Sequence, residues 1–193
     1  MTKKRMRMRF RRGLMTGRFQ PFHNGHLALA RQALAECEEL VIVIGSAQFN
    51  FIEKDPFTAG ERVSMIHAAL KEAGVDLARC YIVPVANDEN NARWLAGLRS
   101  QVPPFDALYS GNEFVDYLAR SQDPSVAVRK PEFANREEYN GTHIRALIAS
   151  GGDNKKEEWE RLVPPAVAKA IVEAGGVERI KMLTRSDTDP NRW

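Results

Sequence analysis

Two histidines stand three residues apart where an apolar strand gives way to an amphipathic helix, in the segment Gly17-Arg18-Phe19-Gln20-Pro21-Phe22-His23-Asn24-Gly25-His26. His23 and His26 project to one side of that helix. Gly25 lets the backbone approach a ligand closely, and the N–H groups of a first helical turn favour an anion. With the guanidinium of Arg18, the segment is typical of a phosphate-binding pocket. The alternative interpretation is a strand-to-helix turn whose histidines only cap the helix.

This segment resembles the G-x-F-x-P-x-H-x-G-H motif of the nucleotidyltransferase superfamily with the H-x-G-H fingerprint. Members of that superfamily transfer AMP or CMP from a nucleoside triphosphate to a phosphate or an alcohol. Their second motif, I-S-S/G-T-x-x-R, is matched by Tyr139-Asn140-Gly141-Thr142-His143-Ile144-Arg145, with Asn140 in place of the usual Ser. Because Asn also caps helices and donates hydrogen bonds, we expect retuned phosphate binding and not a loss of activity.

Further segments are similar to the archaeal-type nicotinamide-nucleotide adenylyltransferases, which make NAD from ATP and nicotinamide mononucleotide (NMN). They are Gly45-Ser46-Ala47-Gln48, Asp55-Pro56-Phe57-Thr58-Ala59-Gly60-Glu61-Arg62, Asn91-Ala92-Arg93-Trp94 and Gly176-Val177-Glu178-Arg179-Ile180-Lys181. The resemblance extends from about Gly13 to Leu183. It implies AMP transfer to NMN, with nicotinate mononucleotide as a second acceptor, and a homo-oligomer for which a hexamer is one candidate size.

The resemblance also implies the site residues. The histidines contact the triphosphate and Arg145 holds its distal phosphates, so His23, His26, Arg18 and Arg145 form the catalytic set. The expected ATP-binding residues are Gly17, Arg18, Phe19, His23, Gly25, His26, Gly111, Asn112, Asn140, Thr142 and Arg145. The expected NMN-binding residues are Ser46, Lys54, Asn87, Asn91, Trp94 and Arg136.

Trp94 lies just past a predicted strand, beside Asn87, Asp88 and Asn91. An indole face stacks on a planar cationic ring, and amides pair with a carboxamide edge. The resemblance implies that Trp94 stacks on nicotinamide, with Asn91 in the same pocket. The alternative is a core tryptophan on a short helix. Lys54 stands where relatives often carry Arg. It could bind a phosphate as a point charge, or it could be an exposed lysine with a structural role only.

The implied nucleophile is the 5′-phosphate of NMN, which is largely dianionic near neutral pH because its second pKa is about 6. No proton has to be removed, and the sequence has no H-E-x-x-H, G-x-S-x-G or Walker loop. The remaining task is to align two anions and to stabilise charge on the α-phosphate and the departing pyrophosphate. We expect a divalent cation, Mg²⁺ or another, carried mainly by ATP, and no metal site made of protein side chains.

Composition places the chain among ordinary globular proteins. Its 193 residues suit a single domain over 1–193, with a basic extension at about 1–8 and a flexible tail at about 186–193. No apolar run approaches a membrane span or a signal peptide, so we expect no membrane partner. The spacing of Cys37 and Cys80 suits neither a metal nor a redox pair, which indicates reduced thiols and a cytoplasmic location.

The N-terminus is strongly basic although the net charge is only +3. Seven of the first twelve residues are basic: Lys3, Lys4, Arg5, Arg7, Arg9, Arg11 and Arg12. Because no aromatic residues alternate with these charges in the manner of a nucleic-acid surface, we interpret them as a solubilising extension ahead of the first strand. No nucleic-acid partner is therefore expected.

Alternating apolar and amphipathic segments predict an α/β fold: a Rossmann-like parallel sheet with helices on both faces and a helical C-terminal segment. The first strand is expected to end at 14–16, and further strands are expected at 40–44, 81–85, 107–109 and 126–128. Helices are expected from Gly25, after a capping box of Thr58 with Glu61, and at 90–100, 142–150, 156–162, 165–174 and 177–183. The loops after the strands should meet at one rim of the sheet, where ligands bind.

Three alternatives remain open on the sequence. The enzyme could act on another phosphate acceptor, such as phosphopantetheine or FMN. The scaffold could be a non-catalytic nucleotide-binding regulator, although both histidines, Arg18 and Arg145 are retained. A class I aminoacyl-tRNA synthetase fragment would share an H-x-G-H motif, but the chain is too short for an anticodon domain, and Lys181-Met182-Leu183-Thr184-Arg185-Ser186 only faintly resembles K-M-S-K-S.

Overall fold

The computed structural model describes residues 9–132 and 138–185, and its strands form a five-stranded parallel sheet. The strand order is β3-β2-β1-β4-β5. The strands are β1 (Phe10–Gly17), β2 (Cys37–Ile44), β3 (Cys80–Pro84), β4 (Ala107–Tyr109) and β5 (Ala127–Arg129). The helices are α1 (Asn24–Glu36), α2 (Ala59–Glu72), α3 (Trp94–Arg99), α4 (Glu113–Gln122), α5 (Gly141–Ser150), α6 (Asp153–Leu162), α7 (Pro165–Glu173) and α8 (Gly176–Arg185), with short 3₁₀ turns η1 (Leu77–Arg79) and η2 (Asn91–Arg93).

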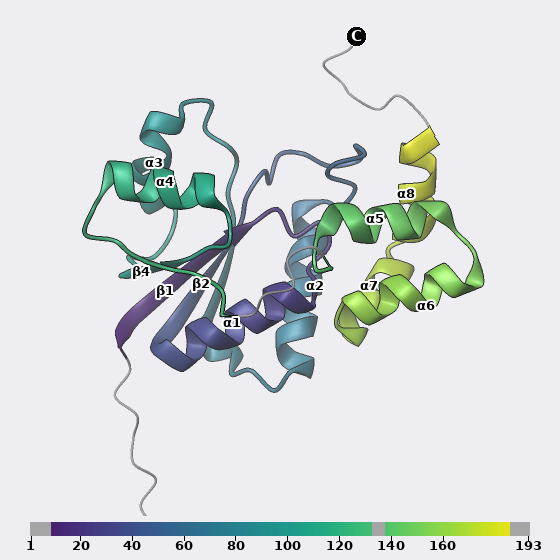
Figure 1. Ribbon diagram of the computed structural model, residues 1–193, viewed down its shortest axis with the longest axis horizontal. Coiled ribbons are helices and arrows are strands. Elements are labelled where there is room, and N and C mark those ends of the chain that lie inside the picture. The colour runs from purple at the N-terminus through teal and green to yellow at the C-terminus, as the bar shows by residue number, and fades with distance from the viewer. Residues whose placement is uncertain (1–8, 133–137, 186–193) are drawn as a thin grey trace, which may run out of the picture.

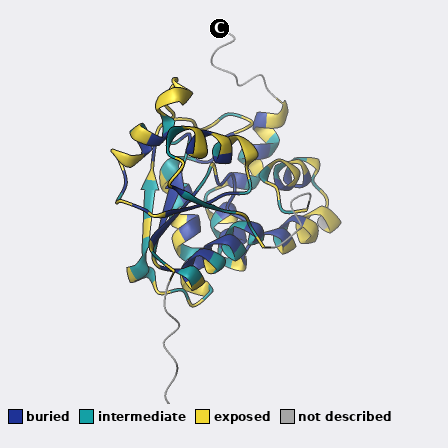
Figure 2. Cartoon of the chain, turned by 60° about the vertical axis from the view of Figure 1, so that its left-hand side comes forward, coloured by how far each residue is buried: buried dark blue, intermediate teal, exposed yellow. Residues whose placement is uncertain are grey.

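Helices cover both faces of the sheet, as predicted. Alternate side chains of β1 and β2 point to opposite faces, so Met15 and Ile42 pack with α1 and α2 while Leu14 and Val41 pack with α3 and α4. The middle residues of β1 and most residues of β2 are buried, and the outer helix faces are exposed (Figure 2). The C-terminal helices α5 to α8 gather beside α2, away from α3 and α4 (Figure 1). None of the described helices combines the length and hydropathy needed to cross a bilayer.

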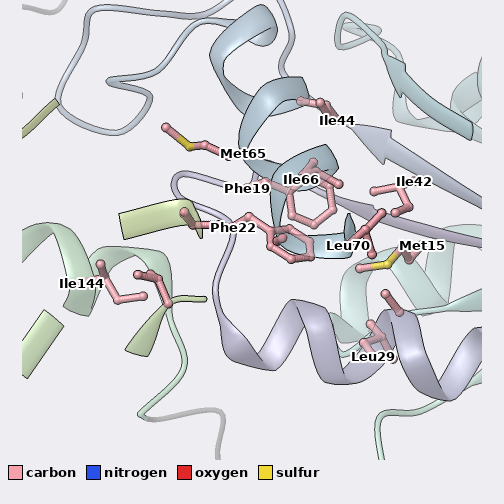
Figure 3. Packing of buried hydrophobic residues seen from close by; sticks show 14 of the residues in the cluster. Met15, Phe19, Phe22, Leu29, Ile42, Ile44, Met65, Ile66, Leu70 and Ile144 are labelled. Atoms are coloured by element: carbon pink, nitrogen blue, oxygen red, sulfur yellow. The ribbon is translucent and has the colours of Figure 1, made fainter. Parts of the chain in front are cut away.

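An aromatic pair anchors the segment between β1 and α1 in this core. Phe19 and Phe22 are buried with ring centroids 5.6 Å apart, and they lie next to each other in the cluster formed with α2 and α5 (Figure 3). The side chain of Gln20 both donates to the Phe57 carbonyl and accepts from the Phe57 N–H, each at 2.9 Å. These contacts tie the segment to the residues that lead into α2, so it has little freedom to move.

Several predicted boundaries were wrong. The first strand begins at Phe10, so Arg11 and Arg12 belong to the sheet and not to an extension. Arg12 is buried because it pairs with Glu39 on β2 and lies over the Tyr81 ring. Helix α6 begins at Asp153, three residues before the expected start of the helix at 156–162. The predicted extension at 1–8 and tail at 186–193 lie outside the described residues.

Helix α4 was not predicted at all. Its exposed aromatic residues Phe114 and Tyr117 obscure the apolar face formed by Leu118 and Ala119. The start signal was nevertheless present, because Asn112 caps the helix by accepting a hydrogen bond from the Phe114 N–H at 3.0 Å. The other expected helices are present, including the Thr58–Glu61 capping box of α2.

Candidate active site

Two cavities open at the carboxyl ends of the strands. Hydrogen bonds from Gly45 N–H to the Gly17 carbonyl, from Val85 N–H to the Ile44 carbonyl and from Ser110 N–H to the Arg129 carbonyl hold the loops at one rim, as predicted. One cavity, of about 440 Å³, lies beside α1. The other, of about 230 Å³, lies beside α3. Thr16, near the end of β1, lines both, so the two cavities meet at the central strand.

The larger cavity, which we call the helix-terminus cavity, is lined by the N-caps of three helices: His23 of α1, Asn112 of α4 and Asn140 of α5. Asn140 accepts hydrogen bonds from Thr142 N–H at 2.9 Å and His143 N–H at 3.0 Å, so it caps as predicted. Helix N-termini carry partial positive charge and favour anions. The cavity is therefore suited to a polyanion. Its other lining residues are Met15, Thr16, Gly17, Gly25, His26, Leu29, Ser110, Gly111, Lys130, Pro131 and Tyr139.

The two histidines cap α1 with each other. The Nδ1 atom of His23 accepts from the His26 N–H at 3.3 Å, and the Nδ1 atom of His26 accepts from the His23 N–H at 3.3 Å. Their rings stack with centroids 3.5 Å apart, and the Phe19 ring supports His26 edge-on at 4.7 Å. Because both Nδ1 atoms act as acceptors, we assign the ring proton of each neutral imidazole to Nε2.

Burial keeps both imidazoles neutral. It lowers the pKa of His23 to about 4, and burial together with the adjacent His23 lowers the pKa of His26 well below its usual value. The histidines therefore offer Nε2–H donors to a phosphate and not full positive charges. The sequence left capping and phosphate binding as alternatives, but this geometry permits both because capping uses only Nδ1.

Arg145 is fixed between α5 and the segment after β1. Its Nη1 donates to the Gln20 carbonyl at 2.8 Å, and its Nη2 donates to Thr142 Oγ1 at 3.3 Å. Gly141 makes this approach possible, since a Cβ at that position would lie 2.8 Å from the Gln20 carbonyl oxygen. Burial lowers the pKa of Arg145, with a smaller lowering by Arg18. The second motif thus packs directly against the first.

The remaining expected ATP and phosphate residues differ in their placement. The Arg18 side chain is 48% exposed and its Nη1 lies 3.6 Å from Asp55 Oδ2. Phe19 is buried and supports His26, so its side chain is not open to a ligand. Lys54 and Thr142 are exposed and line neither cavity. Arg136 lies outside the described residues.

The smaller cavity, which we call the Trp94 cavity, brings together Asn87, Asn91 and Trp94 as expected. Trp94 is partly buried and also packs against the core beneath α3 and α4, so it lies at the border between cavity and core. Ser46 is held beside Asn87, whose Oδ1 accepts from the Ser46 N–H at 3.0 Å and Oγ at 3.2 Å. An aromatic face and several amides therefore border one small space. Lining residues that we had not predicted include Thr16, Val85, Asp88, Gln101 and Phe114.

Known proteins resemble this chain in sequence and in fold. Residues 14–147 match the profile of the family described as Cytidylyltransferase-like. The nicotinamide-nucleotide adenylyltransferase of Caldivirga maquilingensis is 47% identical over 182 residues, covering 94% of this chain and 99% of the relative. The enzyme of the same name from Pyrobaculum neutrophilum is 45% identical over 183 residues, covering 95% of this chain and 99% of the relative. The chain belongs to the nicotinamide-nucleotide adenylyltransferase family.

Solved structures show the same fold at low sequence identity. A bifunctional NMN adenylyltransferase/ADP ribose pyrophosphatase from Francisella tularensis aligns with a TM-score of 0.78 at 21% identity, covering 91% of this chain and 53% of that one. The chain thus spans about half the length of that bifunctional protein. The same protein complexed with AMP and a manganese ion aligns with a TM-score of 0.74 at 23% identity, covering 91% and 52%. These likenesses confirm the α/β nucleotidyltransferase fold.

In this member of the nicotinamide-nucleotide adenylyltransferase family, a buried arginine connects the loops that border the two cavities. We had assigned no role to this residue from the sequence. The Arg62 side chain of α2 is fully buried and donates to the carbonyls of Thr58, Arg18, Gly45, Ser46 and Phe49. It thereby fixes the segment after β1 against the loop after β2. A signal existed in the sequence, because Arg62 lies one helical turn before the apolar Ile66 and therefore faces the core.

Because folded His23 stays neutral, the stability of the protein against unfolding depends on pH. Its folded pKa of about 4 lies below the unfolded value of about 6.5, so protonation favours the unfolded state. The stabilising effect of keeping His23 neutral is fully present above pH 6.5 and is lost as the pH falls toward 4. At pH 5 we expect a loss of about 2 kcal/mol from this group, or roughly 4–8 °C in Tm for a chain of this length.

Thermal unfolding followed between pH 7.5 and pH 5 measures this loss. His23→Asn is the matched control, because an amide oxygen still caps the helix but does not titrate. The Tm of that variant should fall less steeply with pH. Equal slopes for the two proteins would show that His23 does not titrate as the geometry requires.

Proposed function

We propose that the protein transfers AMP from ATP to NMN, giving NAD and pyrophosphate, and that nicotinate mononucleotide is a second acceptor. The meeting of the two cavities at Thr16 is the observation that carries this proposal. The helix-terminus cavity suits the triphosphate, and the Trp94 cavity suits a planar ring with an amide. Their junction is where the α-phosphate and the acceptor phosphate would meet.

In the proposed reaction, a 5′-phosphate oxygen of NMN attacks the α-phosphorus of ATP. The new P–O bond forms as the bond from the α-phosphorus to the oxygen that bridges to the β-phosphate breaks, and pyrophosphate leaves with that electron pair. No proton transfer is required, because the acceptor phosphate is already ionised. The protein's work is to position both anions and to stabilise the charge that shifts to the leaving group.

Named side chains suit these tasks. The Nε2–H groups of His23 and His26 donate to the triphosphate, and the helix N-termini add partial positive charge. Arg145 supplies a full charge for the distal phosphates, and Arg18 a second. Trp94 stacks on the nicotinamide ring, Asn91 lies beside it, and Asn87 is fixed by Ser46.

We propose that a divalent cation such as Mg²⁺ enters bound to ATP. Among residues 9–132 and 138–185, no group of three or more His, Cys, Asp or Glu side chains is arranged to hold a metal. Mg²⁺ is often bound by substrate phosphates and water molecules with few protein side chains. An ion that is carried by the nucleotide therefore needs no such cluster. When bound, the ion neutralises charge on the phosphates. Omitting the metal from the assay tests this directly.

We also propose a homo-oligomer, with a hexamer as one candidate, which light scattering of the purified protein measures.

Cys37 and Cys80 are both free in the structure, as predicted. Free thiols are usual in a reducing compartment and support a cytoplasmic location.

An acceptor panel tests the proposed reaction. Purified protein with labelled ATP and Mg²⁺ should release pyrophosphate with NMN and form NAD, and it should form the deamidated product with nicotinate mononucleotide. Phosphopantetheine and FMN are tested as alternative acceptors, because the sequence left another phosphate acceptor of this kind open. Release with either of these but not with NMN would refute the assigned acceptor and leave only nucleotidyl transfer. No release with any acceptor would favour a regulatory role.

A further inference from the structure

Asp55 is an acidic residue beside Arg18, one of the two arginines that we propose hold the triphosphate. It is only 4% exposed, and its backbone closes a bridge with Ile52 just before α2. Its Oδ2 lies 3.6 Å from Nη1 of Arg18. Its Oδ1 is buried without a hydrogen-bond partner within the described part of the chain. A buried carboxylate oxygen left without a donor is destabilising, so a compensating role is expected.

The surroundings of Asp55 are strongly positive. Arg18 lowers the pKa of both Arg62 and Arg145, after the larger effect of burial, while Asp55 raises both. Smaller increases come from Glu61 for Arg62 and from Glu53 for Arg145. Arg62 is committed to five backbone carbonyls, and Arg145 to the Gln20 carbonyl and Thr142. Arg18 differs, because in the described structure the carboxylate of Asp55 is its only ion-pair partner. Arg18 is thus the member of the cluster that can exchange its partner.

We propose that Asp55 is a positioning residue: it is the resident counter-ion of the Arg18, Arg62 and Arg145 cluster, and the triphosphate takes its place on Arg18 when ATP binds. The inference rests on the proposed function only in taking a polyphosphate as the ligand of this rim. Without Asp55, the three guanidinium groups would repel one another more strongly, since Arg62 is fully buried and Arg145 is partly buried, although Arg18 is 48% exposed. Asp55 relieves that repulsion in the free protein and competes with the ligand for the same charge.

This role predicts effects of opposite sign on stability and on binding. Asp55→Asn keeps the shape of the side chain but removes its charge. The free protein should lose about 2–6 °C in Tm, because the cations repel one another without a counter-ion. The same variant should bind a polyphosphate about five- to tenfold more tightly at low ionic strength, since the ligand no longer competes with a carboxylate. The gain should shrink as salt screens the charges.

Titration calorimetry with inorganic tripolyphosphate, without metal or acceptor, measures the binding. Glu39→Gln is the matched control, because Glu39 also pairs with an arginine, Arg12, but near the amino ends of the strands. It should lower Tm and leave tripolyphosphate affinity unchanged. In an Arg18→Gln background, Asp55→Asn should have less than half of its effect on affinity, since the partner over which the two anions compete is gone.

The outcomes separate this inference from the proposed function. If wild-type protein binds tripolyphosphate and Asp55→Asn binds it equally or more weakly, Asp55 is not a competing counter-ion, whereas the phosphate site stands. If wild-type protein shows no binding, this inference is refuted, whereas the proposed function still rests on the acceptor panel. Should Asp55→Asn not fold, Asp55→Ser carries the same test, and loss of folding in both would assign Asp55 a purely structural role.

Discussion

Replacing His26 by Ala should lower kcat for AMP transfer by about 10²–10³ while changing the KM for NMN little. His26 lines the helix-terminus cavity, where we propose that its Nε2–H stabilises charge on the phosphates. Loss of one such donor typically has this effect. The variant also removes the acceptor of the His23 N–H. A decrease in stability is therefore expected alongside the decrease in rate, and the two effects have to be separated.

Two further variants separate them. His26→Asn places an amide near the position of Nδ1, so it can accept from the His23 N–H but cannot reach as far as Nε2. His26→Gln reaches further and can donate near the position of Nε2, but it fits the cap less well. We expect near-normal Tm with low kcat for Asn, and reduced Tm with partly restored kcat for Gln. If kcat followed Tm across all three variants, His26 would be a capping residue alone.

The same residue illustrates how far the sequence could lead. Spacing and residue type placed His23 and His26 at a helix start beside an anion site, and the resemblance named the ligand. Neither could show that the two rings cap each other through Nδ1, because that depends on a backbone conformation and a stacking distance set by the packing of Phe19. The protonation state of the pair follows from that packing and so required the structure.

Charged residues that act through other residues were the hardest to predict. Arg62 and Asp55 lie within a segment used for the family resemblance, yet the sequence suggested no task for either. Their roles depend on contacts between parts of the chain far apart in sequence, such as Arg62 with the Arg18 carbonyl. The rim of the sheet, in contrast, was predictable because parallel strands deliver their following loops to one edge.

Sequence reasoning left two roles open for Trp94, ring stacking and core packing, and the structure supports a part in each. It lines the Trp94 cavity and also packs against the core beneath α3. Trp94→Ala should raise the KM for NMN by about 5- to 150-fold, since stacking of a base on an aromatic ring contributes roughly 1–3 kcal/mol. The KM for ATP should remain within about twofold, because no residue of α3 lines the cavity proposed for the triphosphate.

Steady-state kinetics with each substrate varied in turn measures this split. Trp94→Phe should recover part of the loss because it keeps an aromatic face. Leu95→Ala is the matched control for packing: Leu95 is 2% exposed on the same helix and does not line the cavity. It should cost about 2–5 kcal/mol of stability and leave the KM for NMN near normal. If Trp94→Ala instead behaved like Leu95→Ala, the tryptophan would be a core residue and nicotinamide recognition would rest on the amides of Asn87 and Asn91.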